Sequence, residues 1–508
     1  MAVVGGPAPT RLTERAGAWV TPTTSLAYEC NVGAFAAALP HPDLRIDEVS
    51  IPKGFQRAQR DKFSDYWMEA VHKEWTGIVE NDTLDFVRRK DVPRDANIMH
   101  CHFVFDAKPT KSGALEKIKA RLVADGNTQK HGVDFEHVFA TVVKLTSVRL
   151  VLVLAAAHGW LLWQYDICQA FLQSDLHEDL YMRMPPHLSD RDADGNLLVC
   201  KLKKSLYGLK QAAREWADTL TAALLRFGFR RSIIDTGVYR YDGTDNRLLI
   251  LMVYVDDLVL AYSHDDVRVT FAEYISRTLP VDDRGPLEWV LRMHVQRTPD
   301  SKGFFFSQQQ YAERVLEKYV VDRDLLSDVD TPLPENTPTA DMCPEVGSEE
   351  HSAMATKRAW FMSVIGALLW MAGGTRPDLT YAVSTLARFC SNPGRAHVKV
   401  LMHLLSYVSR TRARVLLLRP DMTREVDIYS DASWAAKHSV SGGLVLYLGI
   451  LVAWWSRLQK SVAASTSGTL RVRFVRPLGW QRSAHSSSAK VSPGPAGALL
   501  VACACNVQ

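Results

Sequence analysis

The most constraining feature of the sequence is a pair of adjacent carboxylates inside an otherwise apolar stretch, Leu248 to Tyr262. Aliphatic runs flank Asp256 and Asp257, which predicts a strand, a tight turn and a returning strand. Neighbouring carboxylates repel each other and lose hydration beside so much apolar surface, so a cation must offset them, and a divalent metal does this best. The pattern therefore predicts a magnesium site at the tip of a hairpin. The alternative is an exposed acidic turn, because Asp is common in turns.

A third carboxylate lies in an earlier apolar run. The stretch from Lys144 to Trp160 predicts a helix ending near Gly159, and Leu161 to Ile167 predicts a buried strand interrupted by Asp166. A lone carboxylate in such a strand is costly unless it is ligated or paired. We expect Asp166 to be the third metal ligand; the alternative is a strand-end residue that caps the following helix.

Basic residues form two further patterns. Lys117, Lys119 and Arg121 alternate along a predicted strand and share one face, which suits a triphosphate or a nucleic-acid backbone, although a solvated strand face is the alternative. Further on, lysines and an arginine surround Tyr207 and Gly208, a combination that permits close approach to a phosphate and a base.

Charge and composition limit the classes of function. The 508 residues allow two to four domains, and we expect no membrane segment and no secretory signal because no apolar run has the required length or position. The net charge is +4, but the residues from Ala432 onward carry +8, so the preceding residues carry −4. Nucleic acid would therefore be bound through local patches. The eight scattered cysteines indicate reduced thiols and an intracellular location.

Taken in order, segments from Phe63 to Lys460 resemble the reverse transcriptase of copia-type long-terminal-repeat retrotransposon polyproteins. The likeness is spread along the chain, which makes it more specific than the hairpin alone. The matching strings are KARLV (119–123), TQKHGVDF (128–135), VVKLTSVRL (142–150), QYDICQAFL (164–172), KKSLYGLKQA (203–212), YVDDL (254–258), SQQQYAERVLEKY (307–319), TRPDLTYAV (375–383) and SDASWA (430–435).

The resemblance implies an α+β fold of the right-hand polymerase kind, with fingers, palm and thumb, a helical connection and a partial ribonuclease H-like α/β fragment. The expected divisions are an unassigned segment (1–50), fingers (51–145), palm with the catalytic hairpin (146–300), thumb and connection (301–422), a partial ribonuclease H-like region (423–467) and a divergent, disordered tail (468–508).

The resemblance also implies the chemistry. Asp166, Asp256 and Asp257 match the catalytic and metal-binding carboxylates of the palm, which would hold two Mg²⁺ ions, with Mn²⁺ as a substitute, for template-directed nucleotidyl transfer. The implied partners are an RNA template, a DNA primer and deoxynucleoside triphosphates. The residues expected to bind the nucleotide are Lys119, Arg121, Phe171, Gly208, Gln211 and Tyr254. Phe171 matches an aromatic gate that excludes a 2′-hydroxyl; the alternative is a core aromatic residue.

Four positions depart from the family pattern. Asp125 and Asn127 replace the usual Lys and Phe, Ala213 replaces a Pro, and Arg292 replaces the Gly of the primer-grip string. Arg in place of Gly is disruptive where the backbone needs positive φ or close approach. We therefore expect weakened primer positioning, which a primer-extension assay of Arg292→Gly would test.

The C-terminal region departs further. Asp431 matches the first ribonuclease H carboxylate and is also the last acidic residue of the chain. Ribonuclease H chemistry needs several carboxylates around two metals. We therefore expect a truncated or frameshifted ribonuclease H portion without hydrolytic activity.

Two other functions remain open on the sequence. One is a catalytically impaired retroelement relic, or a co-opted nucleic-acid-binding protein, that keeps the fold without turnover. The other is a generic metal-dependent phosphohydrolase, which the polymerase order of the basic and aromatic elements disfavours.

Overall fold

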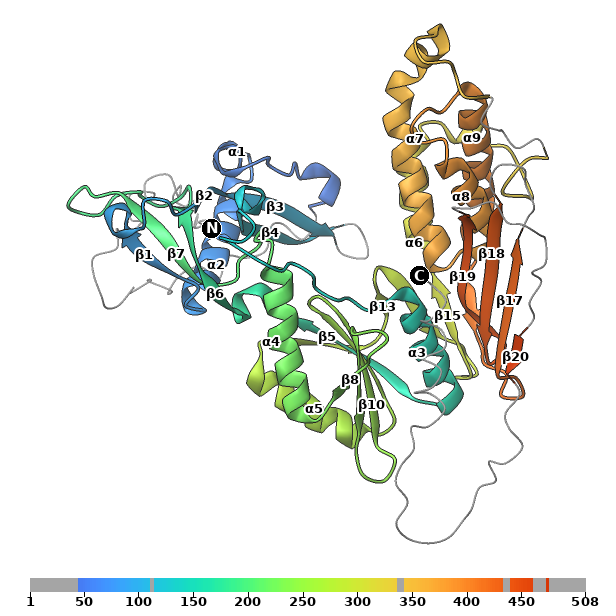
Figure 1. The fold of residues 1–508 in the computed structure, drawn as a ribbon, viewed down its shortest axis with the longest axis horizontal. Helices are drawn as coiled ribbons and strands as arrows, with labels where there is room; N and C mark the ends of the chain where they lie inside the picture. Colours follow the sequence, from blue (N-terminus) through green and yellow to red (C-terminus); the bar gives the residue numbers. More distant parts are fainter. Residues whose placement is uncertain (1–43, 110–113, 336–341, 433–438, 460–471, 475–508) are drawn as a thin grey trace, which may run out of the picture. The chain divides into compact units, whose positions relative to one another are not determined.

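The computed structural model describes residues 44–109, 114–335, 342–432, 439–459 and 472–474. The chain divides into two compact units (Figure 1). The first unit comprises Met1–Thr141, Ile167–Arg226 and Arg277–Pro280, and the second comprises Val142–Asp166, Phe227–Ser276 and Val281–Gln508. Both units are therefore built from segments that are discontinuous in sequence.

The first unit has an aromatic core between helices, a sheet and a long hairpin. Its elements are α1 (Phe55–Arg60), α2 (Ser64–Glu80), β1 (Leu84–Arg88), β2 (Ile98–Met99), β3 (Cys101–Pro109), β4 (Leu115–Ala124), the 3₁₀ helix η6 (Ala170–Gln173), β6 (Asp175–Arg183), β7 (Leu198–Lys204) and α4 (Ala212–Phe227). The sheet has the order β1-β7-β6-β2, and β3 pairs with β4 in the hairpin. Trp67 of α2 packs edge-on against Phe105 of β3, with 5.4 Å between ring centroids, and so joins the helix to the hairpin.

The second unit is organised around a six-stranded sheet. Its first elements are α3 (Leu145–His158), β5 (Leu161–Ile167), β8 (Arg230–Arg231), β9 (Val238–Asp242), β10 (Leu248–Tyr254), β11 (Asp257–Tyr262), α5 (Asp265–Thr278) and β12 (Val281–Pro286). The strand order is β12-β5-β11-β10-β9-β8. Almost every residue of β10 and β11 is buried, as their continuous aliphatic sequence requires for strands covered on both faces.

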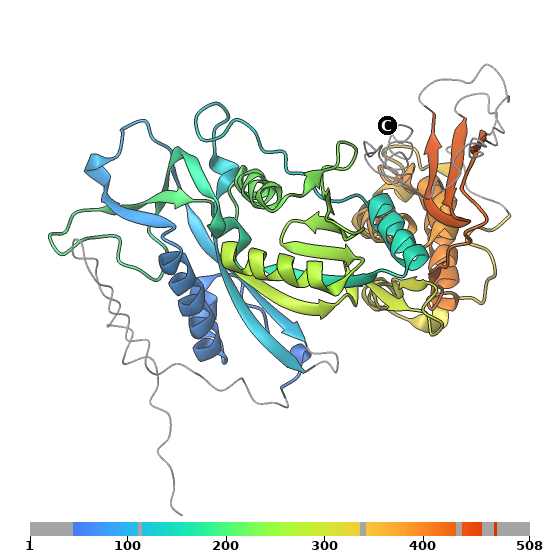
Figure 2. The ribbon, with the colours of Figure 1, turned by 90° about the horizontal axis from the view of Figure 1, so that it is seen from below.

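Two helices cover the two faces of this sheet. On one face, Phe271 of α5 contacts Tyr165 of β5, with 6.1 Å between ring centroids, and Figure 2 shows α5 lying across the strands. On the other face, Met252 and Val259 belong to the same core cluster as the residues of α3. Apolar residues occupy nearly every side of α3, so this helix is buried almost throughout. It ends at Gly159, which has a φ of 70° and forms a left-handed C-cap, as the sequence predicted.

The rest of the second unit consists of a small sheet, a group of helices and a C-terminal sheet. The small sheet has the order β13-β14-β15-β16, and the C-terminal sheet has the order β19-β18-β17-β20. The elements are β13 (Trp289–Val290), β14 (Met293–Arg297), β15 (Phe304–Ser307), α6 (Gln309–Tyr319), α7 (Glu349–Gly374), α8 (Thr380–Ala387), α9 (Arg395–Arg410), β16 (Leu416–Leu418), β17 (Val426–Ala432), β18 (Val440–Tyr447), β19 (Ile450–Leu458) and β20 (Val472–Phe474). Of the predicted C-terminal tail, 468–508, the structure describes only β20, which pairs with β17.

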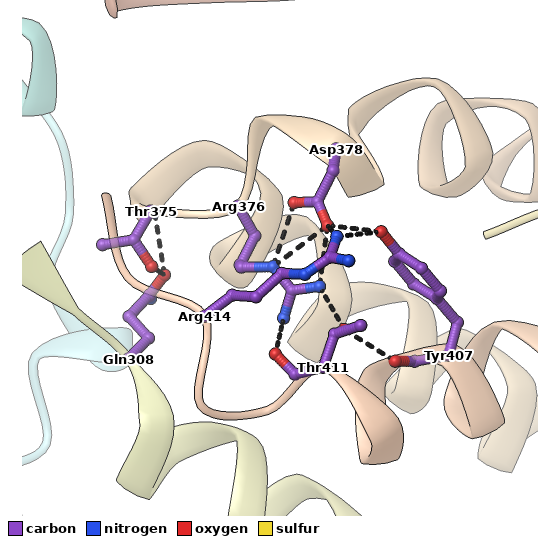
Figure 3. Close-up of polar contacts among 7 residues, drawn as sticks. All are labelled: Gln308, Thr375, Arg376, Asp378, Tyr407, Thr411 and Arg414. Carbon is purple, nitrogen blue, oxygen red and sulfur yellow. Dashed lines mark hydrogen bonds and ion pairs between the residues drawn. The ribbon is translucent and has the colours of Figure 1, made fainter. Parts of the chain in front are cut away.

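A buried polar network joins the α7–α8 junction to α9 (Figure 3). Arg376, which is 3% exposed, donates to both carboxylate oxygens of Asp378 at 2.8–2.9 Å, and to the hydroxyl of Thr411 at 2.6 Å. The hydroxyl of Tyr407 donates to Asp378 at 2.9 Å. Burial opposes ionisation of Asp378, but these hydrogen bonds hold its pKa below the usual range. Residues Thr375 to Asp378 therefore form an ordered junction between α7 and α8.

A buried arginine joins α3 to the C-terminal sheet. The guanidinium of Arg149 donates to the carbonyls of Val452, Gly373 and Gly374 at 2.7–2.8 Å, and lies over the ring of Trp454 at 4.0 Å. Burial lowers the pKa of Arg149. These bonds satisfy carbonyls at the C-terminal end of α7, where a cation also interacts favourably with the helix dipole. The C-terminal sheet is thus part of the same packed core as α3.

Among the residues that the structure describes, no helix combines the length and the apolar character needed to cross a lipid bilayer.

Candidate active site

Three aspartates come together at the end of the six-stranded sheet. In the register of β5 and β11, Asp166 is directly opposite Asp257. Tyr254 of β10 pairs with Asp257, so Val255 and Asp256 form a two-residue hairpin loop. Directly opposed residues of antiparallel strands point to the same face, about 5 Å apart at Cβ. The sequence placed both Asp256 and Asp257 in the turn, whereas Asp257 is the first residue of the returning strand.

The loop that carries Asp256 has a strained backbone. Val255 has a φ of 58°, in the left-handed region that β-branched residues rarely occupy. Positive φ at the first loop residue alone is the pattern of a type II′ turn, which normally has Gly there. Such strain persists only where the surrounding structure fixes it, and it is concentrated at functional sites.

The three carboxylates interact electrostatically. Burial, followed by repulsion from Asp256 and Asp166, raises the pKa of Asp257 to about 6. The amide of Gln164, on the same face of β5, donates a long 3.5 Å hydrogen bond to Oδ1 of Asp257. Arg284 of β12 donates to Oδ2 of Asp166 at 3.0 Å. The sequence reasoning identified neither Gln164 nor Arg284. The position of Gln164 two residues before Asp166 was the only available signal for it.

The three aspartates supply the kind of ligand atom, carboxylate oxygen, that a hard divalent cation prefers. Three carboxylates that repel one another form an oxygen-rich, electron-rich set of the type that Mg²⁺ and Mn²⁺ prefer. Within the described part of the chain, however, no group of three or more His, Cys, Asp or Glu side chains is arranged so that it could hold a metal ion. The three carboxylates therefore lie near one another at the end of the sheet, but not in the arrangement of a metal site.

A small hollow lies below the Asp257 carboxyl. It has a volume of about 10 Å³ and is lined by Val143, Gln164, Met252, Tyr254, Asp257, Val259, Val290 and Leu291. This is about the space for one water molecule. Its mostly aliphatic lining accounts for the desolvation that raises the pKa of Asp257, and Val290 and Leu291 bring the β13–β14 hairpin next to the carboxylates.

The β13–β14 hairpin has a two-residue loop of its own. Val290 pairs with Met293, and the loop residues Leu291 and Arg292 have φ values of 50° and 62°. Two successive positive φ values are the pattern of a type I′ turn, for which Asn-Gly is preferred. The condition under which Arg292 was expected to be disruptive, a backbone with positive φ, therefore holds.

Two of the predicted nucleotide-binding residues lie on β4 of the first unit. Lys119 and Arg121 are partly exposed, and the guanidinium of Arg121 lies 5.6 Å from the ring centroid of Tyr207. Burial, followed by repulsion from Lys108, Lys117 and Arg121, lowers the pKa of Lys119 to about 8. A cation strip of this kind gains stability when an anion binds to it.

The other predicted nucleotide-binding residues of this unit, Phe171, Gly208 and Gln211, each make close contacts with their neighbours. The ring of Phe171 contacts Tyr207 edge-on, with 5.1 Å between centroids, and is partly buried in the core. Gly208 has a φ of 91°, and a Cβ there would lie 2.1 Å from the carbonyl oxygen of Ala124, so glycine is required for packing. Gln211 is fully buried and bonds to Gln129. These contacts give all three residues a structural reason to be present.

The C-terminal sheet carries the predicted ribonuclease H residue. Asp431 lies in β17 opposite Gly442 and is exposed. Asp427 of the same strand is buried. In the part of this sheet that the structure describes, Asp431 belongs to no metal-binding group.

Comparisons with known proteins agree with the sequence pattern. Residues 81–329 match the family described as "Reverse transcriptase (RNA-dependent DNA polymerase)". The chain is 33% identical over 405 residues to the retrovirus-related Pol polyprotein from transposon TNT 1-94 of Nicotiana tabacum, which is 79% of this chain and 30% of the polyprotein. It is 32% identical over 405 residues to the Pol polyprotein from transposon RE1 of Arabidopsis thaliana, covering 79% of this chain and 26% of the polyprotein. The chain thus spans less than a third of the length of these relatives.

Proposed function

Residues 81–329 of this chain belong to the reverse transcriptase (RNA-dependent DNA polymerase) family, and on that premise we propose that the chain is the RNA-directed DNA polymerase module of a copia-type retrotransposon polyprotein. It would extend a DNA primer on an RNA template with deoxynucleoside triphosphates. The observation that carries the proposal is the register of β5, β11 and β10, which sets Asp166 opposite Asp257 and Asp256 in the adjoining loop.

In this proposal, Asp166, Asp256 and Asp257 hold two divalent ions. When bound, Mg²⁺ lowers the pKa of the primer 3′-hydroxyl and neutralises charge on the departing pyrophosphate. The carboxyl of Asp257 must be ionised to act as a ligand, and its raised pKa leaves it ionised above about pH 6. Gln164 orients Asp257 through its amide, and the aliphatic hollow keeps bulk water from that side of the carboxyl.

The remaining roles follow from the chemistry of each side chain. Lys119 and Arg121 bind the triphosphate of the incoming nucleotide, and its negative charge raises the lowered pKa of Lys119. Phe171 selects deoxyribose by occupying the space of a 2′-hydroxyl, while Tyr207 supports its ring. Gly208 and Gln211 act by fixing the loop around Tyr207. Tyr254, which is 38% exposed, offers a ring and hydroxyl beside the carboxylates.

The domain roles are proposals of the same kind. The segments 51–145 and 146–300 act as fingers and palm, 301–422 as thumb and connection, and 423–467 as a ribonuclease H-like remnant. We assign no hydrolysis to this remnant, because Asp431 is the last acidic residue of the sequence and ribonuclease H chemistry needs several carboxylates around two metals. Release of labelled RNA from an RNA/DNA hybrid, abolished by Asp431→Asn, would contradict this assignment.

The direct test is incorporation of labelled dTTP on poly(rA)/oligo(dT) by the purified chain. We expect incorporation that requires Mg²⁺ or Mn²⁺ and is abolished by Asp257→Asn. The matched control is Asp245→Asn, since Asp245 is an exposed acid of the same unit that pairs with Arg247 at 3.1 Å. Incorporation that survives Asp257→Asn would overturn the assignment of the site.

The second candidate is a nucleic-acid-binding relic without turnover. The positive φ of Arg292 favours it, because strain in this loop lies next to the carboxylates. This candidate predicts that the wild-type chain binds an RNA/DNA primer-template in a gel-shift assay yet incorporates no nucleotide with either metal.

A further inference from the structure

A basic side chain lies directly on one of the three carboxylates. Arg284 is on β12, the edge strand next to β5, and its Nη2 donates to Oδ2 of Asp166 at 3.0 Å. The same nitrogen is 3.1 Å from Oδ2 of Asp282. One guanidinium is therefore shared between a candidate metal ligand and an acid of its own strand.

The backbone around Arg284 is fastened to β5. The indole of Trp163, three residues before Asp166, donates to Oδ1 of Asp283 at 2.6 Å, and the amide of Gly285 donates to the same oxygen at 2.8 Å. Successive residues of a strand point to opposite faces. Since Asp283 is held on the Trp163 face, Arg284 is directed to the Asp166 face.

This ion pair engages one carboxylate oxygen of the candidate metal site. Oδ2 of Asp166 already accepts a charge-assisted hydrogen bond from Arg284. A metal bound through this oxygen would need the same lone pair. Among the described residues, the three carboxylates do not form a group that could hold a metal ion. The pair is also easy to open, because the side chains of Arg284 and Asp166 are 52% and 30% exposed, and a half-exposed ion pair is weak.

We propose that Arg284 is a positioning residue that occupies Asp166 as an internal counter-ion in the metal-free protein and must release it before a divalent cation can be bound by the three aspartates. The proposal rests on the function proposed above only in taking Asp166, Asp256 and Asp257 as the metal ligands. Arg284 then sets the cation concentration at which the site assembles. Metal and guanidinium compete for the same oxygen, so removal of the guanidinium tightens metal binding.

The experiment measures Mn²⁺ binding to the full chain without nucleic acid or nucleotide, from the loss of the free-ion signal in electron paramagnetic resonance. We expect Arg284→Gln to bind Mn²⁺ about 3- to 10-fold more tightly than wild type, as removal of one cation from a partly exposed carboxylate predicts. Arg284→Lys keeps the charge and should stay within about twofold of wild type. The matched control is Arg247→Gln, which removes an arginine paired with Asp266 at 2.7 Å, away from the three aspartates.

Two further variants assign the effect. Asp166→Asn in the Arg284→Gln background should abolish the gain, since Asp166 is the oxygen donor that Arg284 releases. Circular dichroism and melting of every variant verify the fold, and if Arg284→Gln does not fold, Arg284→Leu replaces it in the same comparison.

The outcomes separate this inference from the polymerase assignment. Mn²⁺ affinity of the neutral variant equal to or weaker than that of wild type, or equal tightening in Arg284→Lys, would overturn the role of Arg284. Tighter Mn²⁺ binding without any nucleotide incorporation would support the role of Arg284 while refuting the polymerase activity.

Discussion

Two hairpin loops of the second unit have the same length and carry opposite charges. The β10–β11 loop consists of Val255 and Asp256, and the β13–β14 loop consists of Leu291 and Arg292. Both use positive φ without glycine, and residues from both hairpins line the same small hollow. In the first loop the strain accompanies the carboxylates of the site. In the second it falls on an exposed arginine where the resembling family has glycine.

The difference shows that a strained backbone does not by itself identify a functional residue. The Val255 loop joins β10 and β11, which lie between β5 and β9 in the six-stranded sheet, so the surrounding structure can enforce a costly conformation in the loop that carries Asp256. The Arg292 loop ends a hairpin that pairs through only two residues of β13, and it carries an arginine where the first loop carries a carboxylate. Four predictions test this comparison.

The largest expected effect is seen when the charge of each loop is removed in turn. Asp256→Asn should lower kcat for nucleotide incorporation by at least about 10³-fold, because an amide cannot replace a carboxylate that stabilises bound cations. Arg292→Ala, which removes the opposite charge from the other loop, should change kcat by less than about threefold. Steady-state incorporation at saturating Mg²⁺ measures both, and comparable losses in the two variants would refute the comparison.

Glycine in the first loop should reduce activity. Glycine adopts positive φ without strain, so Val255→Gly removes the strain of this loop. It also lets the loop sample more conformations, so the carboxylates are less well positioned. We expect kcat to fall about 3- to 10-fold, with little change in melting temperature because relief of strain and the greater freedom of the unfolded chain offset each other. An unchanged kcat would mean that the strain at Val255 does not position Asp256.

Glycine in the second loop should increase activity rather than reduce it. Arg292→Gly removes the same kind of strain from an exposed position, and as at Val255 the greater freedom of the unfolded chain offsets this relief, so the melting temperature should change little. Primer extension should increase about two- to threefold, since the hairpin beside the carboxylates relaxes. Arg292→Ala is the control, because alanine removes the charge and keeps the strain; equal gains in both variants would assign the effect to charge.

The smallest expected effect is a pH dependence that arises next to the first loop, at Asp257, the first residue of β11. The folded protein holds the proton of Asp257 up to a pKa of about 6, whereas an unfolded Asp loses it near pH 4. Folding is therefore favoured by the protonated form, and this group's contribution to the free energy of unfolding falls by about 1 kcal/mol as pH rises from about 4 to about 6.

Melting with a metal chelator measures this dependence. The melting temperature of Asp257→Asn relative to wild type should increase between pH 5 and pH 7.5, whereas that of Arg292→Gly relative to wild type should not change. A difference for Asp257→Asn that is independent of pH would show that Asp257 is not destabilised by its ionisation.

The local elements were largely predictable from the sequence. The strand Leu161–Ile167 has the predicted bounds, and the helix before it ends at the predicted glycine. These segments have strong patterns that tertiary contacts reinforce rather than override. The three aspartates could be singled out because each interrupts an apolar run, where an unpaired carboxylate is costly.

Other features depended on contacts between distant residues. The close approach of Gly208 to Ala124 and the buried hydrogen bond between Gln211 and Gln129 could not be seen in a basic, glycine-containing stretch, because Ala124 and Gln129 lie some 80 residues earlier. In the sequence, Arg149 is the one arginine of a largely apolar helix, with no partner in sight. Its partners Val452 and Gly373 follow it by more than 200 residues. Neither pairing has a periodic signal in the sequence.

The sequence by itself determined the strands, the turn and the carboxylates, because periodicity and the cost of burying charge act over a few residues. Only the tertiary structure decided which positive charge faces Asp166 and which backbone turns are strained. Arg284 reaches that carboxylate from 118 residues away, and the positive φ of Arg292 arises from the pairing of β13 with β14. Both depend on strand register, which is fixed by the packing of the whole unit.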